Sequence, residues 1–493
     1  MSRWFQRPHY HRLSLKTVLS AAFLAAMFLA AGPSFAQDRD TPDAAATPSK
    51  FLEIRGSAKS PDERNARDIW KSTEELSEAR LGRFEEFFFK KYLPQMTQAY
   101  MREDLPSFRD DLRREFLDRD PGNPKTIDQL NDILFRFMYG VARGARRARL
   151  NSGKFADVFW IESDLYSMDG TKITDQVQAL LPAKKDFHPA VRYNAMLILG
   201  DLNTKKAKIV QRPQKEPEIA VPADPYLQAF TPMLDVAIGK EYRPSISKFA
   251  QTETGPAPEA VRIAALLGLK RHLDAKPTEN AGLKDIVIGE MIKLANRQVE
   301  GAGADWRRRL AVEILGTLPY EGTDGKAIVS DLDLILNNAE YPISVRCAAA
   351  KAIGNLQVDT APSKESATKL TQNLRRLAIE ACLEQVARGE SPVQEMSAAE
   401  LIASLNDILI GLRGYGDLKP ADDEDAEEAE EPEIGGVQAW IGESDQNDFR
   451  SAVRLVLTLI VEADKLDVAV VSDDAMARFV RNIARIDRGN PRK

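Results

Sequence analysis

The 493-residue sequence has little of the chemistry that most active sites use, with only four histidines and two cysteines. It contains no H-x-x-x-H or C-x-x-C spacing, so the usual zinc and redox motifs are missing. The Gly-rich phosphate loops and the G-x-S-x-G nucleophile turn are absent as well. We therefore expect no catalytic residue, no metal site and no cofactor, and the sequence gives no reason to assign an enzymatic activity.

The few reactive side chains that remain after residue 36 have simple structural explanations. Cys347 and Cys382 fall in consecutive helical segments, where a small thiol packs as an apolar residue. Export to an oxidising compartment would permit a disulfide, but its geometry cannot be read from spacing, so the bridge stays an alternative to two buried thiols. His188 at a helix start and His272 near a helix end are expected as capping or surface residues.

Long apolar runs are also missing beyond the first 36 residues. Four basic residues and no acidic one precede an almost wholly apolar run at 17–31, and a small-x-small site ends at Ala36. This order is typical of a secretory signal peptide. The run has 15 residues, which is short for a membrane span that needs about 20. We predict cleavage after Ala36 and a periplasmic or extracellular protein without a stable membrane span.

Basic charge is not in excess anywhere in the array. The net charge is −6, and it becomes −10 without the four basic residues at the N-terminus. Nine acidic residues fall within 421–433, where like charges repel one another and resist burial. The remainder is close to neutral, which excludes a strongly basic nucleic-acid groove. We predict a solvated acidic loop at 416–440 rather than a cation site, because no EF-hand spacing is present.

What the sequence does contain is a repeated helical segment. In each copy an apolar or charged residue and Arg precede small residues, and three of the four copies close on Gly-x-Leu. The arginines are 70, 46 and 38 residues apart. The longest interval holds Pro-rich insertions at 203–225 and 244–258, so its extra length is expected to lie in loops. Self-similarity over tens of residues predicts stacked repeats. The copies are 191–202, 261–273, 307–318 and 345–356, with a weaker fifth unit at 392–396 that lacks the Arg.

Each copy predicts a helix with one apolar face. Val191, Ala195, Ile198 and Leu202 follow helical spacing, and a central Ala lets neighbouring helices approach closely. Second amphipathic segments alternate with the copies, and each is expected to be the antiparallel partner of the helix before it. No strand is predicted inside the array. The second segments are 224–240, 283–297, 326–339 and 367–388.

The Arg-x-x-Ala and Gly-x-Leu pattern resembles the HEAT repeat over about residues 186–410. The resemblance implies an all-α fold: a right-handed α-solenoid of HEAT-like helix pairs, with an N-terminal helical region and a C-terminal helical cap. Units of this kind are roughly 40 to 47 residues long. The expected order is a signal peptide at 1–36, a flexible leader at 37–60, an N-terminal helical region at 61–165, the repeat array at 166–415, an acidic disordered loop at 416–440 and the cap at 441–493. Helices at 448–466 and 474–486 are expected to form this cap.

The N-terminal helical region has two strong features. Its aromatic residues follow helical spacing and are expected to form core. A helix is predicted at 126–149, ending in a basic cluster that either complements the helix C-terminus or forms a weak anion site. The stretch 155–169 is ambiguous between helix and extended linker. The aromatics are Phe84, Phe87, Phe88 and Tyr92, and the basic cluster is Arg143, Arg146, Arg147 and Arg149.

The recurring arginines are the candidate binding residues. Guanidinium groups one repeat apart could form a ladder that binds carboxylates or sulfated glycans. The resemblance implies a structural alternative, in which each Arg holds an acid of the same or the next repeat, with Asp186, Asp305 and Glu340 as the nearest candidates. The ladder consists of Arg192, Arg262, Arg308 and Arg346.

These features together predict an exported, non-enzymatic scaffold or adaptor that binds a protein partner through the surface of its helices. Two alternatives stay open. The resemblance to HEAT-like bilin lyases would allow an enzyme with a site in the groove. A module that binds cell-wall or other polysaccharide would differ from the scaffold only in its partner. Nucleic acid is not expected as a partner, since the array lacks a basic face.

Overall fold

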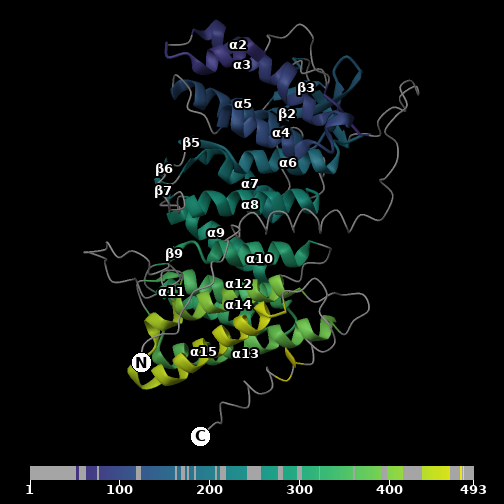
Figure 1. The fold of residues 1–493 in the computed structure, drawn as a ribbon. Coiled ribbons are helices and arrows are strands. Elements are labelled where there is room, and N and C mark those ends of the chain that lie inside the picture. The colour runs from purple at the N-terminus through teal and green to yellow at the C-terminus, as the bar shows by residue number, and fades with distance from the viewer. Residues whose placement is uncertain are drawn as a thin grey trace. The chain divides into compact units, whose positions relative to one another are not determined.

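Helices dominate the computed structural model, as the sequence predicts (Figure 1). All the residues that it describes belong to the unit Phe51–Lys493. They are 51–54, 63–74, 77–117, 124–161, 164–167, 173–174, 177–182, 185–205, 208–210, 218–221, 223–240, 257–275, 281–296, 303–320, 323–358, 361–389, 397–414, 436–466, 478–479 and 481.

The N-terminal helices enclose the aromatic core that the sequence predicts. Phe84, Phe87 and Phe88 are buried, and the rings of Phe84 and Phe88 meet edge to face at 5.0 Å. A π turn brings neighbouring aromatics inward, because the amide of Leu93 bonds to the carbonyl of Phe88 five residues back. The elements here are α2 (Glu63–Lys71), α3 (Glu78–Phe87), α4 (Leu105–Leu112), the π turns Phe88–Tyr92 and Arg113–Leu117, and the 3-10 turns Leu93–Thr97 and Ala99–Met101.

Helix α5 (Pro124–Arg143) ends earlier than predicted. Gly144 follows it with φ of +88°, a left-handed backbone that glycine adopts without a steric penalty. The prediction of a helix through Arg149 is therefore wrong. Arg146, Arg147 and Arg149 lie on a strand and not in the last turn of a helix.

A four-stranded antiparallel sheet follows α5, with strand order β3-β2-β1-β4. Ala148 and Val158 are buried together on it, which accounts for extended structure where a helical region was predicted up to 165. The ambiguous stretch 155–169 is thus extended where it is described, and α5 packs against β2. The strands are β1 (Arg146–Leu150), β2 (Phe155–Ile161), β3 (Asp164–Ser167) and β4 (Val177–Pro182).

The four Arg-containing segments all form helices, and each packs against the next one along the chain (Figure 1). The second segments form helices too. Each of them packs mainly on the helix that follows it, so the prediction of a partner before it is wrong. The Arg-containing helices are α6 (Pro189–Gly200), α8 (Glu259–Ala275), α10 (Ala304–Leu315) and α12 (Ile343–Asn355). The second helices are α7 (Phe230–Ile238), α9 (Ala281–Asn296), α11 (Thr323–Asn337) and α13 (Lys364–Gly389).

Two further helices close the described stack. Helix α14 (Ala398–Arg413) packs on α12 and α13. The weak fifth unit predicted at 392–396 lies outside the described residues. Helix α15 (Gln446–Asp464) packs on α13 and α14, which confirms the helix predicted at 448–466. Two 3-10 turns, Gly436–Trp440 and Glu443–Asp445, lead into α15.

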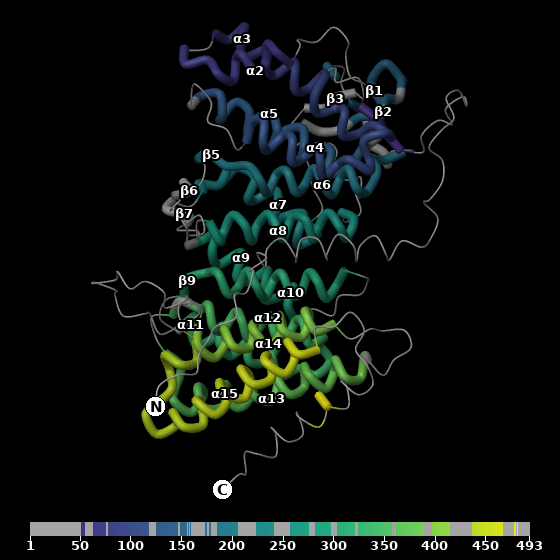
Figure 2. Tube along the Cα trace, viewed as in Figure 1, coloured from purple at the N-terminus to yellow at the C-terminus, as the bar shows by residue number. Residues whose placement is uncertain are grey.

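Short strands occur in the array, where the sequence predicts none. The insertion at 203–225 forms two small antiparallel ladders, and a parallel pair follows α10 and α12. Figure 2 shows β5 at one side of the helices. The prediction that this insertion consists only of loops is therefore wrong, because the chain continues as strand β5 after the buried Leu202. The strands are β5 (Asn203–Lys205), β6 (Lys208–Val210), β7 (Glu218–Val221), β8 (Asp224–Pro225), β9 (Pro319–Tyr320) and β10 (Gln357–Val358).

The end of the leader predicted at 37–60 is held in the core. Leu52 and Ile54 are buried. The amide of Leu52 donates to the carbonyl of Asp186 at 2.9 Å, and the amide of Ile54 donates to Thr97 Oγ1 at 2.8 Å. The prediction of a flexible leader is therefore wrong for residues 51–54, because Leu52 and Ile54 are buried and Ile54 is bonded to Thr97.

Several sequence predictions lie outside the described residues. These are the signal peptide at 1–36, the acidic run at 421–433 and most of the last helix at 474–486. Of that last segment, Phe479 is described and is buried.

Candidate functional site

The four ladder arginines share one contact. Each donates its Nε–H to the carbonyl of the penultimate residue of a neighbouring helix, which is α5 for the first arginine and the second helices α7, α9 and α11 for the other three. Carbonyls in the last turn of a helix lack partners within that helix, so each guanidinium caps a helix end. The pairs are Arg192 with Ala142 at 3.0 Å, Arg262 with Ala237 at 3.3 Å, Arg308 with Ala295 at 3.1 Å, and Arg346 with Leu336 at 2.8 Å.

Three of these arginines also hold an internal carboxylate. Arg192 meets Asp186 at 2.7 Å and Arg308 meets Asp305 at 2.6 Å, as the structural alternative predicts. The prediction for Arg346 is wrong, because Glu340 is exposed ahead of α12, whereas α13 brings Glu380 to 2.5 Å. All three arginines are buried, with burial lowering the pKa of Arg192 while Asp186 opposes it. Their contacts join helices and lie apart from the pocket described below.

The histidines and cysteines are structural as well. His188 begins α6, where its Nδ1 accepts the amide of Ala190 at 3.2 Å, which confirms a capping role. His272 is 2% exposed, so the prediction of a capping or surface residue is wrong there; it packs beside Phe230. Cys347 and Cys382 are both buried and free, and burial raises the pKa of each thiol.

A polar link joins α10, α12 and α14 through Asp407. One carboxylate oxygen lies 3.1 Å from Lys351 Nζ, and the other lies 3.9 Å from Arg309. Arg309 also pairs with Glu313 at 2.9 Å. Burial raises the pKa of Asp407, while Lys351 and Arg309 act in the opposite direction. These charges neutralise one another, so the link serves the packing of three helices rather than a ligand.

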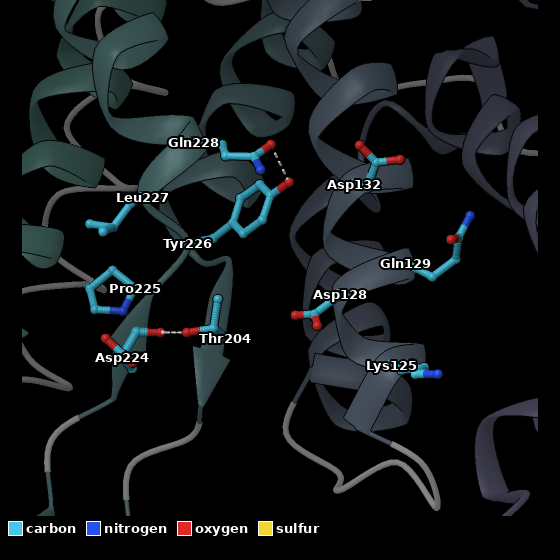
Figure 3. Close-up of a pocket in the computed structure, with 10 residues that line it drawn as sticks. All are labelled: Lys125, Asp128, Gln129, Asp132, Thr204, Asp224, Pro225, Tyr226, Leu227 and Gln228. Atoms are coloured by element: carbon cyan, nitrogen blue, oxygen red, sulfur yellow. Dashed lines mark hydrogen bonds between the residues drawn. The ribbon is translucent and has the colours of Figure 1, made fainter. Parts of the chain in front are cut away.

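An open pocket of about 620 Å³ lies between α5 and the β5–β8 ladder, continuing to the 3-10 turn Leu227–Ala229 (Figure 3). One wall comes from the first half of α5. The other wall follows the strands and the turn across from it. The lining residues are Lys125, Asp128, Gln129 and Asp132 from α5, with Thr204, Asp224, Pro225, Tyr226, Leu227 and Gln228 opposite.

The two walls are held at a fixed separation by contacts behind the pocket. Asn131 donates its side-chain amide to the carbonyl of Asn203 at 2.9 Å, which joins α5 to β5. The ring of Phe135 meets the ring of Tyr226 at 6.1 Å, one turn further along α5. The hydroxyl of Tyr226 donates to Gln228 at 2.7 Å and orients that amide. The pocket is therefore built before any ligand arrives.

The pocket combines carboxylates with an apolar rim. Its carboxylates are spread along the walls, and no group of three metal-ligating side chains occurs among the described residues. Leu227 is 63% exposed at the rim and adds an apolar surface beside the acids. An aliphatic chain with a cationic end matches this combination of groups.

Sequence reasoning missed this pocket because its two walls are about 80 residues apart in the chain. Neither wall carries a motif. One wall falls in a helix that the sequence assigns to packing, and the other falls in an insertion that it assigns to loops. The nearest available signal was the pair Asp128 and Asp132, two acids one helical turn apart on a face that also carries Lys125.

Comparison with known proteins returns no relative. No protein-family model, no curated protein and no solved structure matches the chain significantly. Within the described residues, no helix is both long and apolar enough to cross a membrane.

Proposed function

We propose that the protein is an exported, non-enzymatic scaffold that binds a protein partner through the surface of a right-handed, HEAT-like α-solenoid. The observation that carries the proposal is the recurring arginine contact, which ties the ends of α5, α7, α9 and α11 each to the Arg-containing helix packed on it. A unit that buries its apolar face only against its neighbours gives an extended surface, and such surfaces commonly bind proteins.

The distribution of reactive groups supports binding over catalysis. The buried thiols and His272 lie in packed interior, away from the open pocket. The residues with shifted pKa values lie within helix packing, and none of them lines the pocket. A catalytic site would instead place such groups together in a cleft. Export is supported by the basic, apolar and small-residue order of residues 1–36.

Photo-crosslinking in the producing cells tests this function. A photoreactive amino acid would replace Leu227, Leu334 or Val461, which are 63%, 67% and 55% exposed. We expect a discrete protein adduct of reproducible mass in the exported fraction from at least one position, and none without illumination. No adduct at any position, together with a small molecule or chromophore retained by the purified protein, would favour the lyase alternative instead.

A polysaccharide partner predicts a different result. The same three variants would then give heterogeneous, glycosidase-sensitive adducts instead of one protein of defined mass. The scaffold proposal is wrong if only such adducts form.

A further inference from the structure

We infer that the pocket between α5 and the β5–β8 ladder binds a lysine or arginine side chain presented by an extended segment of the partner. The inference rests on the proposed binding function and names the chemistry of one contact within it. It starts from the charge on α5. Asp128 and Asp132 are one turn apart on the same face, where like charges destabilise a helix by a few tenths of a kcal/mol.

The negative charge of one of these two acids is compensated by an ion pair. Asp132 lies 2.9 Å from Arg136, and that same guanidinium also pairs with Glu85 at 2.9 Å. Asp128 is exposed and makes no ion pair or hydrogen bond with any described residue. In Figure 3 its carboxylate reaches toward the strands across the pocket, whereas Lys125 points away from them. The pocket therefore presents an uncompensated negative charge to its interior.

The opposite wall supplies a surface for an aliphatic stem. Pro225 and Tyr226 are buried beneath it, and Leu227 projects from the rim. Lysine and arginine both carry a methylene chain that packs on apolar groups while the charged end meets an acid or an amide oxygen. A pocket of about 620 Å³ has room for such a side chain together with the residues on either side of it.

The dispersed carboxylates favour this occupant over a metal ion. A divalent cation needs several oxygen ligands converging within about 2.5 Å, and no such group occurs among the described residues. One ammonium or guanidinium group, in contrast, is satisfied by one or two carboxylates with an amide oxygen nearby. Gln129 and Gln228 are among the residues that line the same pocket.

Fluorescence anisotropy with two labelled peptides tests the inference. One peptide carries a single lysine flanked by leucines in a Gly/Ser frame, and the other carries uncharged norleucine in place of the lysine. At low salt we expect the mature full-length protein to prefer the lysine peptide by about tenfold. Equal binding of the two peptides overturns the inference.

Charge-reversal variants locate the preference. Asp128→Lys should abolish it, and Asp128→Asn should reduce it. Asp285→Lys is the matched control, because Asp285 is also exposed and is also the fifth residue of its helix, α9. An equal loss in Asp285→Lys shows that bulk charge attracts the peptide and overturns the inference. Because Asp128 has no partner among the described residues, its variants should melt like the parent.

The apolar rim and the acidic run need separate controls. Leu227→Ser should weaken the lysine peptide, whereas Leu334→Ser, at a similarly exposed leucine of α11, should not. A variant with a Gly/Ser segment at 421–433 should keep the preference. If that variant loses the preference, the lysine peptide binds to the acidic run and the inference about the pocket is wrong. The scaffold function would survive that result, because photo-crosslinking at Leu334 or Val461 tests it independently.

Discussion

Gly200 of α6 faces Gly268 of α8 at the closest approach of the two helices. A Cβ built on Gly200 would lie 2.6 Å from the Cα of Gly268, a distance that real Cβ contacts do not show. In the sequence, the glycine of the second copy is out of register with the others, because it lies six residues after its Arg instead of eight. In space it fills the same helix contact, so two glycines bring the backbones together where a side chain would separate them.

Gly200→Ala should therefore lower the free energy of unfolding by about 1–3 kcal/mol, because the new methyl group meets backbone that cannot move aside. Gly289→Ala in α9 is the matched control, since a Cβ there has nothing within 4 Å. That substitution should stabilise the protein by about 0.5–1 kcal/mol through helix propensity. Denaturant melts measure both changes. Equal effects would contradict the close contact between α6 and α8.

Arg346→Ala should cost about 1.5–3 kcal/mol of stability, because the Leu336 carbonyl and the Glu380 carboxylate both lose a charged donor. The upper part of that range is limited by Glu380, whose side chain is 36% exposed. Arg450→Ala on the exposed face of α15 should change stability by less than about 0.5 kcal/mol. If Arg346→Ala melts like the parent but loses a partner found by crosslinking, the ladder is a binding site.

The repeat helices could be predicted from sequence because their signal is local. Helical spacing, a central Ala and the terminal Gly-x-Leu all lie within about one dozen residues. Their pairing could not be predicted, because the contact that decides it runs from an arginine to the end of another helix. The partner of Arg346 shows the difficulty, since Glu380 lies 34 residues away and a nearer acid, Glu340, was the better guess from spacing.

The sheet and the pocket escaped prediction for related reasons. The apolar pattern of α5 continues toward Arg149 without a visible break, and only the left-handed Gly144 separates helix from strand. Strand β1 then depends on pairing with residues as distant as Pro182. The pocket joins Asp128 to Tyr226 across about 100 residues, and no local pattern encodes that distance.

His272 should make the protein less stable in mild acid. Burial lowers the pKa of His272 to about 4 from an ordinary value of 6.5, and neighbouring Arg271 acts in the same direction. The unfolded chain then binds the proton more readily than the folded protein. The contribution of neutral His272 to the free energy of unfolding is therefore present in full above pH 6.5. It is lost as the pH drops from 6.5 toward 4, which lowers the free energy of unfolding by up to about 3 kcal/mol.

His272→Leu checks this assignment. Denaturant melts at several pH values should show a smaller loss between pH 6.5 and 4 in the variant than in the parent. An identical pH dependence in the two proteins would assign the acid sensitivity to other groups. The comparison is made on the difference between them, because carboxylates titrate in both.

The acidic run can be removed without moving the ends of the helices around it. Gly414 closes α14 and Gly436 begins the next turn, and a Cβ on Gly436 would lie 2.6 Å from the Gly414 nitrogen. Gly414 and Gly436, the described residues on either side of 415–435, therefore lie next to each other. Bringing the two ends of a loop together on folding costs conformational entropy, and this cost falls as the loop is shortened.

Replacing 415–435 with a Gly/Ser link of about six residues should therefore raise the free energy of unfolding by about 1 kcal/mol. Ten acidic residues and one lysine are lost, so the elution from an anion exchanger should shift strongly while the thermal melt does not fall. A Gly/Ser segment of the full length is the control, since it removes the charge and keeps the loop closure. If both variants unfold at lower temperature than the parent, the acidic run makes stabilising contacts and is more than a solvated linker.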